Sequence, residues 1–195
     1  MSNMPNMLAY TIQSSLYQGS ANPPYLIIGS GNNATRLGPQ NPQDDSYWIV
    51  IMDAKNPRSK VKEWIVPGQN NSTVPSGLDT YMNDPDYLFA IATQYLSTLH
   101  VPQGNFYDYL VKYGAGRQLQ RLEQINSVLS CGTYSRMSYI LTGQCGPRGG
   151  NDFPLQSYEV GSASDMQALL LMSLMPMPSG GPPYSICDSY TFVTR

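Results

Sequence analysis

Charged residues are scarce in this sequence. Asp, Glu, Lys and Arg make up 12% of its 195 residues, against the roughly 25% usual in soluble domains. The net charge is −2, and the few Lys and Arg residues form no cluster. Nucleic acids and anionic membranes are bound through basic surfaces. We therefore expect neither of them as a partner.

Long apolar runs are also missing. A membrane-spanning helix needs roughly 18 or more apolar residues, and the longest run here, residues 168–177, is interrupted by Ser173 and Pro176. The first residues lack the basic and apolar regions of a classical signal peptide. The sequence thus predicts a soluble protein without a membrane span, either intracellular or exported by a non-classical route.

Histidine and cysteine are too few for most site chemistries. His100 is the only histidine, and Cys131, Cys145 and Cys187 cannot all pair within one chain. A nucleophilic Cys/His pair would need Cys131 or Cys145 beside His100 in space, which makes these three residues the candidate catalytic ones. A loop histidine and unrelated thiols explain the pattern better, and no zinc-ligand spacing is present. We therefore expect no metal and no cofactor, and favour a protein that is not an enzyme.

Two polar segments resemble ligand-binding loops only in part. Asp79, Asn83, Asp84 and Asp86 are rich in oxygen ligands but lack the alternation and closing Glu of a calcium-binding EF-hand. Capping and turn roles are expected for them. Residues 29–33, GSGNN, follow an apolar segment as a phosphate-binding loop would, but no lysine stands where such a loop needs one. We interpret this segment as a turn.

The most structured stretch is residues 84–127. Residues 87–92 form a continuous apolar run, which is typical of a strand covered on both faces. One helix is then predicted from apolar residues at helical spacing, with Asn105 as its N-cap; these residues are Phe106, Tyr109, Leu110 and Tyr113. A second helix, residues 117–127, directs Leu119, Leu122 and Ile125 inward.

The other elements are mostly strands. They are predicted at residues 8–17, 25–28, 47–52, 60–66, 136–143, 153–160 and 184–193. A short helix is predicted at residues 77–83, and a Met- and Leu-rich helix at residues 165–175, capped by Ser164. We therefore predict one α+β domain over residues 1–195, with curved, mainly antiparallel, sandwich-like β-sheets and flanking α-helices.

A family resemblance lies in the middle of the chain. The segments that carry it are IVIMD at 49–53, LDTY at 78–81, LFAIAT at 88–93, and ILTG at 140–143 followed by Gly146. Their order resembles the interleukin-like EMT inducer domain, also called the PANDER-like or GG domain, over roughly residues 47–146. The resemblance implies a non-enzymatic core with extensions at 1–46 and 147–195 packed on it. Because family members often sit beside carbohydrate-processing modules, it also implies glycan recognition.

Aromatic residues are plentiful. The sequence has 15 Tyr, 2 Trp and 4 Phe, and Tyr among polar neighbours suits adaptable recognition surfaces. Packing inside the sheets is the alternative use of the same residues. We therefore favour a non-enzymatic recognition module for a glycan or a cell-surface ligand. The alternatives are a structural or self-assembling subunit, with the helix at 166–175 as a homo-oligomer interface, and an enzyme or toxin that uses His100 with Cys131 or Cys145.

Overall fold

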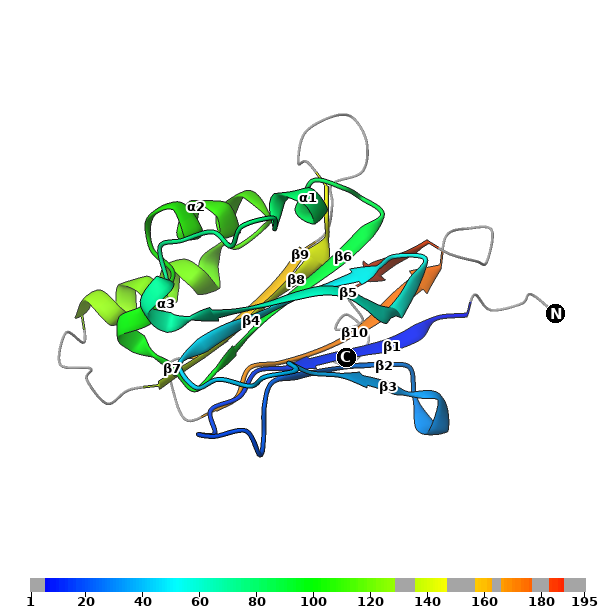
Figure 1. Cartoon of the computed structure of the whole chain (residues 1–195), viewed down its shortest axis with the longest axis horizontal. Coiled ribbons are helices and arrows are strands. Elements are labelled where there is room, and N and C mark those ends of the chain that lie inside the picture. Colours follow the sequence, from blue (N-terminus) through cyan, green and yellow to red (C-terminus); the bar gives the residue numbers. More distant parts are fainter. Residues whose placement is uncertain (1–5, 129–135, 147–156, 163–165, 177–182, 188–195) are drawn as a thin grey trace, which may run out of the picture.

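The chain forms three layers in the computed structural model, which describes residues 6–128, 136–146, 157–162, 166–176 and 183–187. Helices lie on one face of a six-stranded central sheet, and a five-stranded outer sheet packs on its other face (Figure 1). The strand ladders are antiparallel throughout the described residues, apart from an isolated parallel bridge between Ser15 and Gln94. The predicted α+β class with sandwich-like antiparallel sheets is confirmed.

The central sheet has the order β5-β4-β6-β8, with β7 and β9 also paired to β8. Its strands are β4 (Ser46–Asp53), β5 (Asn56–Pro67), β6 (Tyr87–Gln94), β7 (Leu96–Ser97), β8 (Arg136–Gln144) and β9 (Ser157–Ser162). Nearly every residue of β4, β6 and β8 is buried. Continuous apolar sequence is what a strand covered on both faces requires.

The outer sheet joins the two ends of the sequence. Its order is β11-β10-β1-β2-β3, made of β1 (Leu8–Gln13), β2 (Tyr25–Ile28), β3 (Thr35–Leu37), β10 (Leu169–Pro176) and β11 (Tyr184–Cys187). Tyr10 pairs with Met172 across the β1–β10 ladder. Several predicted strands differ at their ends, and the first ends at Gln13. Strand β3 lies where no strand was predicted. Residues 153–156 and 188–193 of two predicted strands lie outside the described residues.

The helical layer follows the predicted spacing, with one corrected cap. It contains α1 (Asp79–Met82), α2 (Gly104–Lys112) and α3 (Arg117–Val128), and the short 3-10 turns are η1 (Gly31–Asn33), η2 (Gly68–Asn70) and η3 (Thr98–His100). The expectation that Asn105 caps α2 is wrong, because the helix begins earlier and Gln103 occupies the N-cap position. Leu119 and Leu122 of α3 are buried as expected, whereas Ile125 is only half-buried.

The predicted helix at residues 165–175 is wrong, since residues 169–176 form strand β10 and residues 166–168 are not helical; its predicted cap, Ser164, lies outside the described residues. Burial alternates along it: Leu170, Met172 and Leu174 are buried, while Leu169 and Leu171 are exposed. A period of two residues is the signature of a strand with one covered face. Apolar residues stand on both faces of β10, so the sequence hides this period.

Two hydrophobic cores lie on the two faces of the central sheet. The core under the helices includes Tyr47, Phe89, Phe106 and Leu119, and those of its buried residues that the structure describes all lie at positions 47–145. The core between the sheets instead combines Tyr10 and other residues near the start of the chain with central-sheet residues and with residues 168–186. The central sheet therefore holds both cores together.

Candidate functional site

Three aromatic side chains form a row at the edge of the helical layer. The ring centroids of Trp64 and Tyr81 lie 6.0 Å apart, and those of Tyr81 and Tyr87 lie 5.3 Å apart. Both contacts are edge-to-face, the arrangement favoured by the charge distribution of aromatic rings. All three side chains are half-buried. This aromatic row, Trp64, Tyr81 and Tyr87, therefore offers apolar ring surface to solvent.

Each ring of the aromatic row comes from a different element. Trp64 lies on the edge strand β5 opposite Ile49, a residue of the core under the helices, and so faces the helical side. Its indole nitrogen donates a hydrogen bond of 3.2 Å to the carbonyl oxygen of Ser76. Tyr81 lies on α1, and Tyr87 begins β6. Strand β5, helix α1 and the first residue of strand β6 thus fix the positions of the three rings relative to one another.

Polar groups border the aromatic row on its α1 side. The Tyr113 hydroxyl donates a 2.8 Å hydrogen bond to Oδ1 of Asn83, and Nδ2 of Asn83 donates to the Asp79 carbonyl oxygen at 3.0 Å. Burial raises the pKa of the Tyr109 hydroxyl well above its ordinary range, and the nearby Asp79 carboxylate raises it further. The Tyr109 hydroxyl is itself buried and closed to solvent.

The acidic residues near the aromatic row act in local turns. Oδ1 of Asp84 accepts a 2.9 Å hydrogen bond from the Asp86 amide, and Asp86 forms an exposed ion pair of 2.8 Å with Lys55. These contacts agree with the turn roles that we expected. In the described part of the chain, no group of His, Cys, Asp and Glu side chains is arranged to hold a metal ion.

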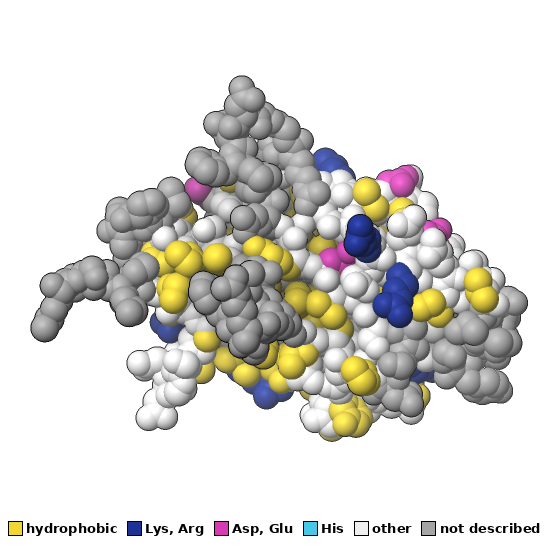
Figure 2. Space-filling view, turned by 180° about the vertical axis from the view of Figure 1, so that it is seen from behind, with side chains coloured by type: hydrophobic (Ala, Val, Ile, Leu, Met, Phe, Trp, Pro, Cys, Tyr) yellow, Lys and Arg dark blue, Asp and Glu magenta, His cyan; other side chains and the backbone are white. Residues whose placement is uncertain are grey.

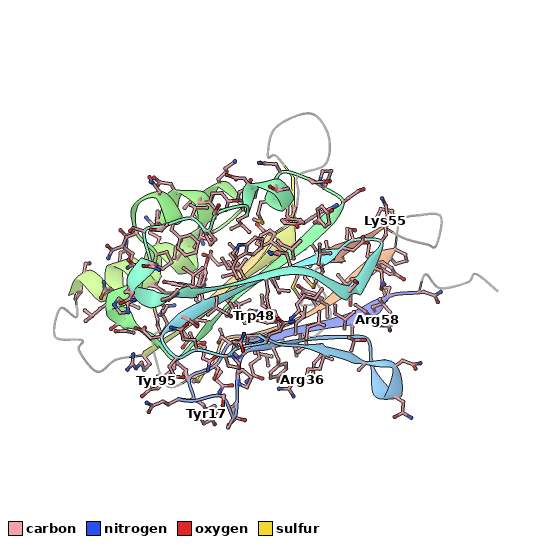
Figure 3. All side chains as sticks on the ribbon, in the orientation of Figure 1. Tyr17, Arg36, Trp48, Lys55, Arg58 and Tyr95 are labelled. Carbon is pink, nitrogen blue, oxygen red and sulfur yellow. The ribbon has the colours of Figure 1, made fainter. Side chains whose placement is uncertain are left out.

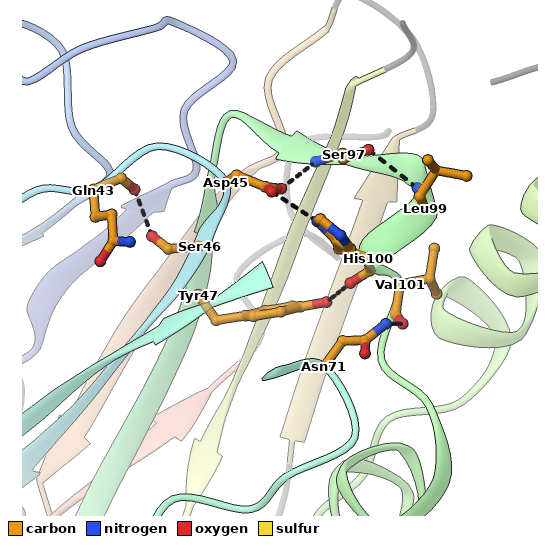
Figure 4. A network of polar contacts seen from close by, with 9 residues as sticks. All are labelled: Gln43, Asp45, Ser46, Tyr47, Asn71, Ser97, Leu99, His100 and Val101. Atoms are coloured by element: carbon orange, nitrogen blue, oxygen red, sulfur yellow. Dashed lines mark hydrogen bonds and ion pairs between the residues drawn. The ribbon is translucent and has the colours of Figure 1, made fainter. Parts of the chain in front are cut away.

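His100 is held by a carboxylate rather than by a thiol. Its Nδ1 lies 2.7 Å from Oδ2 of Asp45, whose Oδ1 accepts a 2.8 Å hydrogen bond from the Ser97 amide (Figure 4). The Tyr47 hydroxyl donates a hydrogen bond to the His100 carbonyl oxygen. The Asp45 backbone adopts the left-handed region, with a φ of 54°, which is uncommon for a residue with a side chain. This cluster ties η3 to the start of β4.

Cys145 lies at the opposite end of the central sheet. Its amide donates to the carbonyl oxygen of Tyr87, the first residue of β6, whereas Asp45 precedes Ser46, which pairs with Gln94 at the end of β6. The eight residues of β6 span about 24 Å at about 3.4 Å per residue. The structure therefore does not bring Cys145 to His100. Cys131 lies outside the described residues.

The Cys145 thiol is also poorly suited to act as a nucleophile. It is buried and belongs to no disulfide. Burial raises its pKa well above the ordinary range, and the Asp84 carboxylate adds to the effect. Since the thiolate is the reactive form of cysteine, Cys145 stays protonated and unreactive at neutral pH. Its Sγ lies 3.8 Å from Sδ of Met82, a packing contact within the core.

Sequence reasoning found the aromatic content but missed the aromatic row. Trp64, Tyr81 and Tyr87 stand in three separate predicted elements. The pairing of β4 with β5 and β6 brings the strands of Trp64 and Tyr87 into one sheet, and Tyr81 lies on the short helix just before β6. The strand predicted at residues 60–66 was the available signal for Trp64, because successive side chains of a strand point to opposite faces. The Asp45–His100 pair left no signal, since 55 positions separate the two residues.

Comparison with known proteins does not assign the chain to a family. No protein-family model matches it, and no curated protein matches it. Among the described residues, no helix is long and apolar enough to cross a membrane.

Proposed function

We propose that this protein is a non-enzymatic recognition module that binds a glycan at the aromatic row. The observation that carries this proposal is the half-buried Trp64 ring, which contacts Tyr81 at one end of the row of three rings. The C–H faces of a sugar pack on such apolar ring surface, and ring hydroxyls and neighbouring amides orient its hydroxyl groups.

The polar border of the aromatic row supports the same assignment. Asp79 and Tyr81 stand on α1 and Asn83 follows directly, so acceptors and donors lie close to the rings. The Tyr113–Asn83 hydrogen bond of 2.8 Å fixes the Asn83 amide. A few fixed polar groups beside apolar surface are the usual composition of a small-ligand site.

Two further observations favour recognition over catalysis. His100 and Cys145 lie at opposite ends of the central sheet, and the Cys145 thiol is held in its unreactive form. The resemblance of residues 47–146 to the interleukin-like EMT inducer domain supports the proposal as well. That resemblance implies a non-enzymatic domain found beside carbohydrate-processing modules.

Tryptophan fluorescence tests the proposal, because the two tryptophans have different surroundings. Trp48 is 1% exposed between the sheets, whereas Trp64 is half-buried in the aromatic row. A glycan array would first identify candidate oligosaccharides. Titration with a hit should change the emission of the wild type and leave the emission of Trp64→Phe nearly unchanged. Calorimetry of Trp64→Ala should show an affinity lowered at least tenfold, which corresponds to a loss of about 1.4 kcal/mol of binding free energy.

The matched control is Tyr17→Ala. Tyr17 is an exposed aromatic residue, 57% accessible, outside the aromatic row, so this variant should keep the wild-type affinity. Failure of every glycan on the array to bind, or equal affinity of Trp64→Ala and the wild type, would overturn the proposal.

Self-assembly is a second candidate function, favoured by exposed leucines. Leu169 and Leu171 are 41% and 48% exposed on the outward side of β10, and Figure 2 shows hydrophobic side chains gathered near the middle of the rear face. Apolar surface of this kind marks many interfaces. Light scattering over a concentration series tests it: assembly predicts a mass that rises with concentration in the wild type and not in Leu171→Asp. A monomer at all concentrations would exclude it.

A further inference from the structure

Arg58 on β5 carries a cation that the described part of the chain does not neutralise. Its Nε atom is buried and has no hydrogen-bond partner there, and no ion pair of Arg58 is found among the same residues. Its neighbours differ: Lys60 pairs with Glu63 at 2.9 Å, and Lys55 pairs with Asp86 at 2.8 Å. A partly desolvated cation without a counter-charge costs free energy, and nearby anions attract it strongly because water screens it less.

A glycine turn holds the Arg58 guanidinium in place. A Cβ atom at Gly29 would lie 2.8 Å from Nη2 of Arg58, so the guanidinium rests directly against the backbone of this turn. Gly29 has a φ of 93°, which residues with side chains rarely adopt. The backbone conformation therefore favours glycine here, and the missing side chain leaves room for the guanidinium.

The same turn supplies neutral donors. Ser30, Asn32 and Asn33 are exposed in the segment that follows Gly29, and they carry a hydroxyl group and two amide groups. Arg58 itself is half-buried, so part of its guanidinium stays accessible from solvent while Nε does not. Figure 3 shows Arg58 where the central sheet faces the outer sheet, and Arg36 on the outer sheet directed away from the central sheet.

We propose that Arg58 and the turn from Gly29 to Asn33 form a binding site for a tetrahedral oxyanion, a phosphate or sulfate group. The accessible guanidinium edge donates charge-assisted hydrogen bonds to the anion, a role for which its planar fork is suited. The serine hydroxyl and asparagine amides of the turn add neutral donors. This site is separate from the aromatic row and does not depend on the function proposed for that row.

Nuclear magnetic resonance tests the site directly. The ¹⁵N-labelled full chain is titrated with inorganic phosphate, and in parallel with sulfate, acetate and chloride at matched ionic strength. The expected result is a saturable shift of the amide signals of residues 29–33 with phosphate or sulfate. The affinity for acetate should be at least tenfold lower, and chloride should cause no such shift. The shift should vanish in Arg58→Met.

Arg36→Met is the matched control. It removes an arginine of the outer sheet, whose guanidinium stacks 4.1 Å from the centroid of the Tyr25 ring. The phosphate shift should remain unchanged in this variant. Arg58→Met should fold with an unchanged or higher melting temperature in chloride, since it removes an unpartnered polar group. Should that variant not fold, Arg58→Lys keeps the charge without the planar fork and should bind phosphate at least tenfold more weakly.

Three results would overturn the assignment. The first is the absence of any saturable shift with phosphate and with sulfate. The second is equal binding of acetate, which would show that the site does not select tetrahedral anions. The third is wild-type phosphate affinity in folded Arg58→Met or Arg58→Lys.

Discussion

Oε1 of Glu159, on β9, accepts a 2.9 Å hydrogen bond from the amide of Leu119 in the first turn of α3. The other carboxylate oxygen accepts from the amides of Gly116 and Gln118 at 2.8 and 3.2 Å. The Tyr139 hydroxyl donates to Oε1 at 2.8 Å. One carboxylate thus satisfies amides that the helix itself leaves unpaired, at the end where a negative charge is favourable.

Glu159→Gln should lower the free energy of unfolding by about 2–4 kcal/mol. The substitution removes the charge that caps α3 and brings an NH₂ group toward donors that need an acceptor. Urea denaturation measures the loss. Glu123→Gln makes the same change at an exposed position of α3 and should cost no more than about 0.5 kcal/mol. Equal stability of the two variants would contradict a capping role.

Leu170→Asp and Leu171→Asp should differ strongly. Leu170 is 6% exposed and faces the core between the sheets, so a carboxylate there is buried without a partner and should prevent folding. Leu171 is 48% exposed, and its substitution should cost less than about 1 kcal/mol. Circular dichroism and urea denaturation distinguish the two. Equal destabilisation by both would contradict the one-sided burial of β10.

Gly68→Ala should break the contact between His100 and Asp45. A Cβ atom at Gly68 would lie 2.8 Å from both Nδ1 of His100 and Oδ1 of Asp45, closer than such atoms approach without displacement. We expect a loss of about 1–3 kcal/mol, typical of overpacking, and a changed imidazole signal in the NMR spectrum. Gly38→Ala is the control, since its Cβ would meet only the Pro24 carbonyl oxygen, at 3.5 Å. An unchanged imidazole signal in Gly68→Ala would contradict the prediction.

Stability should fall as the pH rises above about 8.5, the ordinary pKa of cysteine. Burial raises the pKa of the Cys145 thiol in the folded state. Above about pH 8.5 only the unfolded chain therefore releases this proton, which lowers the free energy of the unfolded chain. The contribution of the protonated Cys145 thiol to the free energy of unfolding is fully present below about pH 8.5. Above that pH it declines by about 1.4 kcal/mol per pH unit. Tyr10, Tyr47 and Tyr139, whose pKa values burial also raises, add to the decline above about pH 10.

Cys145→Ala provides the comparison for this pH dependence. Urea denaturation between pH 8.5 and 10 should show a shallower decline for the variant than for the wild type, although alanine lowers stability at all pH values by leaving a small cavity. Parallel curves for the two proteins would show that Cys145 ionises alike in the folded and unfolded chains.

Sequence patterns predicted those elements whose apolar positions match the residues that the fold buries. The apolar run at residues 87–92 predicted a strand covered on both faces, and β6 is buried between the two cores. The spacing of Phe106, Tyr109 and Leu110 likewise predicted the buried face of α2. The first pattern is apolar at every position, as burial on both faces requires, and the second follows the helical period of 3.6 residues.

The β10 segment shows where such patterns are insufficient. Leu169, Leu170 and Leu171 follow one another, so neither a period of two nor one of 3.6 residues is visible. The strand forms because its edges pair with β1 and β11, and the β1 partner of Leu170 is Ile12, 158 positions away. The aromatic row has the same origin, since contacts between elements and not local sequence bring its rings together.

The division into two cores has a consequence for synthesis on the ribosome. All buried residues that the structure describes in the core under the helices have been made once residue 145 has left the exit tunnel. The core between the sheets still needs Leu170, Met172, Leu174 and Ile186. A nascent chain can therefore bury most of the core under the helices, before Glu159 caps α3, while Trp48 and Val50, on the other face of the central sheet, await β10. During that interval only β1, β2 and β3 of the outer sheet are available to cover this face, so part of its apolar surface stays exposed, the kind of surface that chaperones bind.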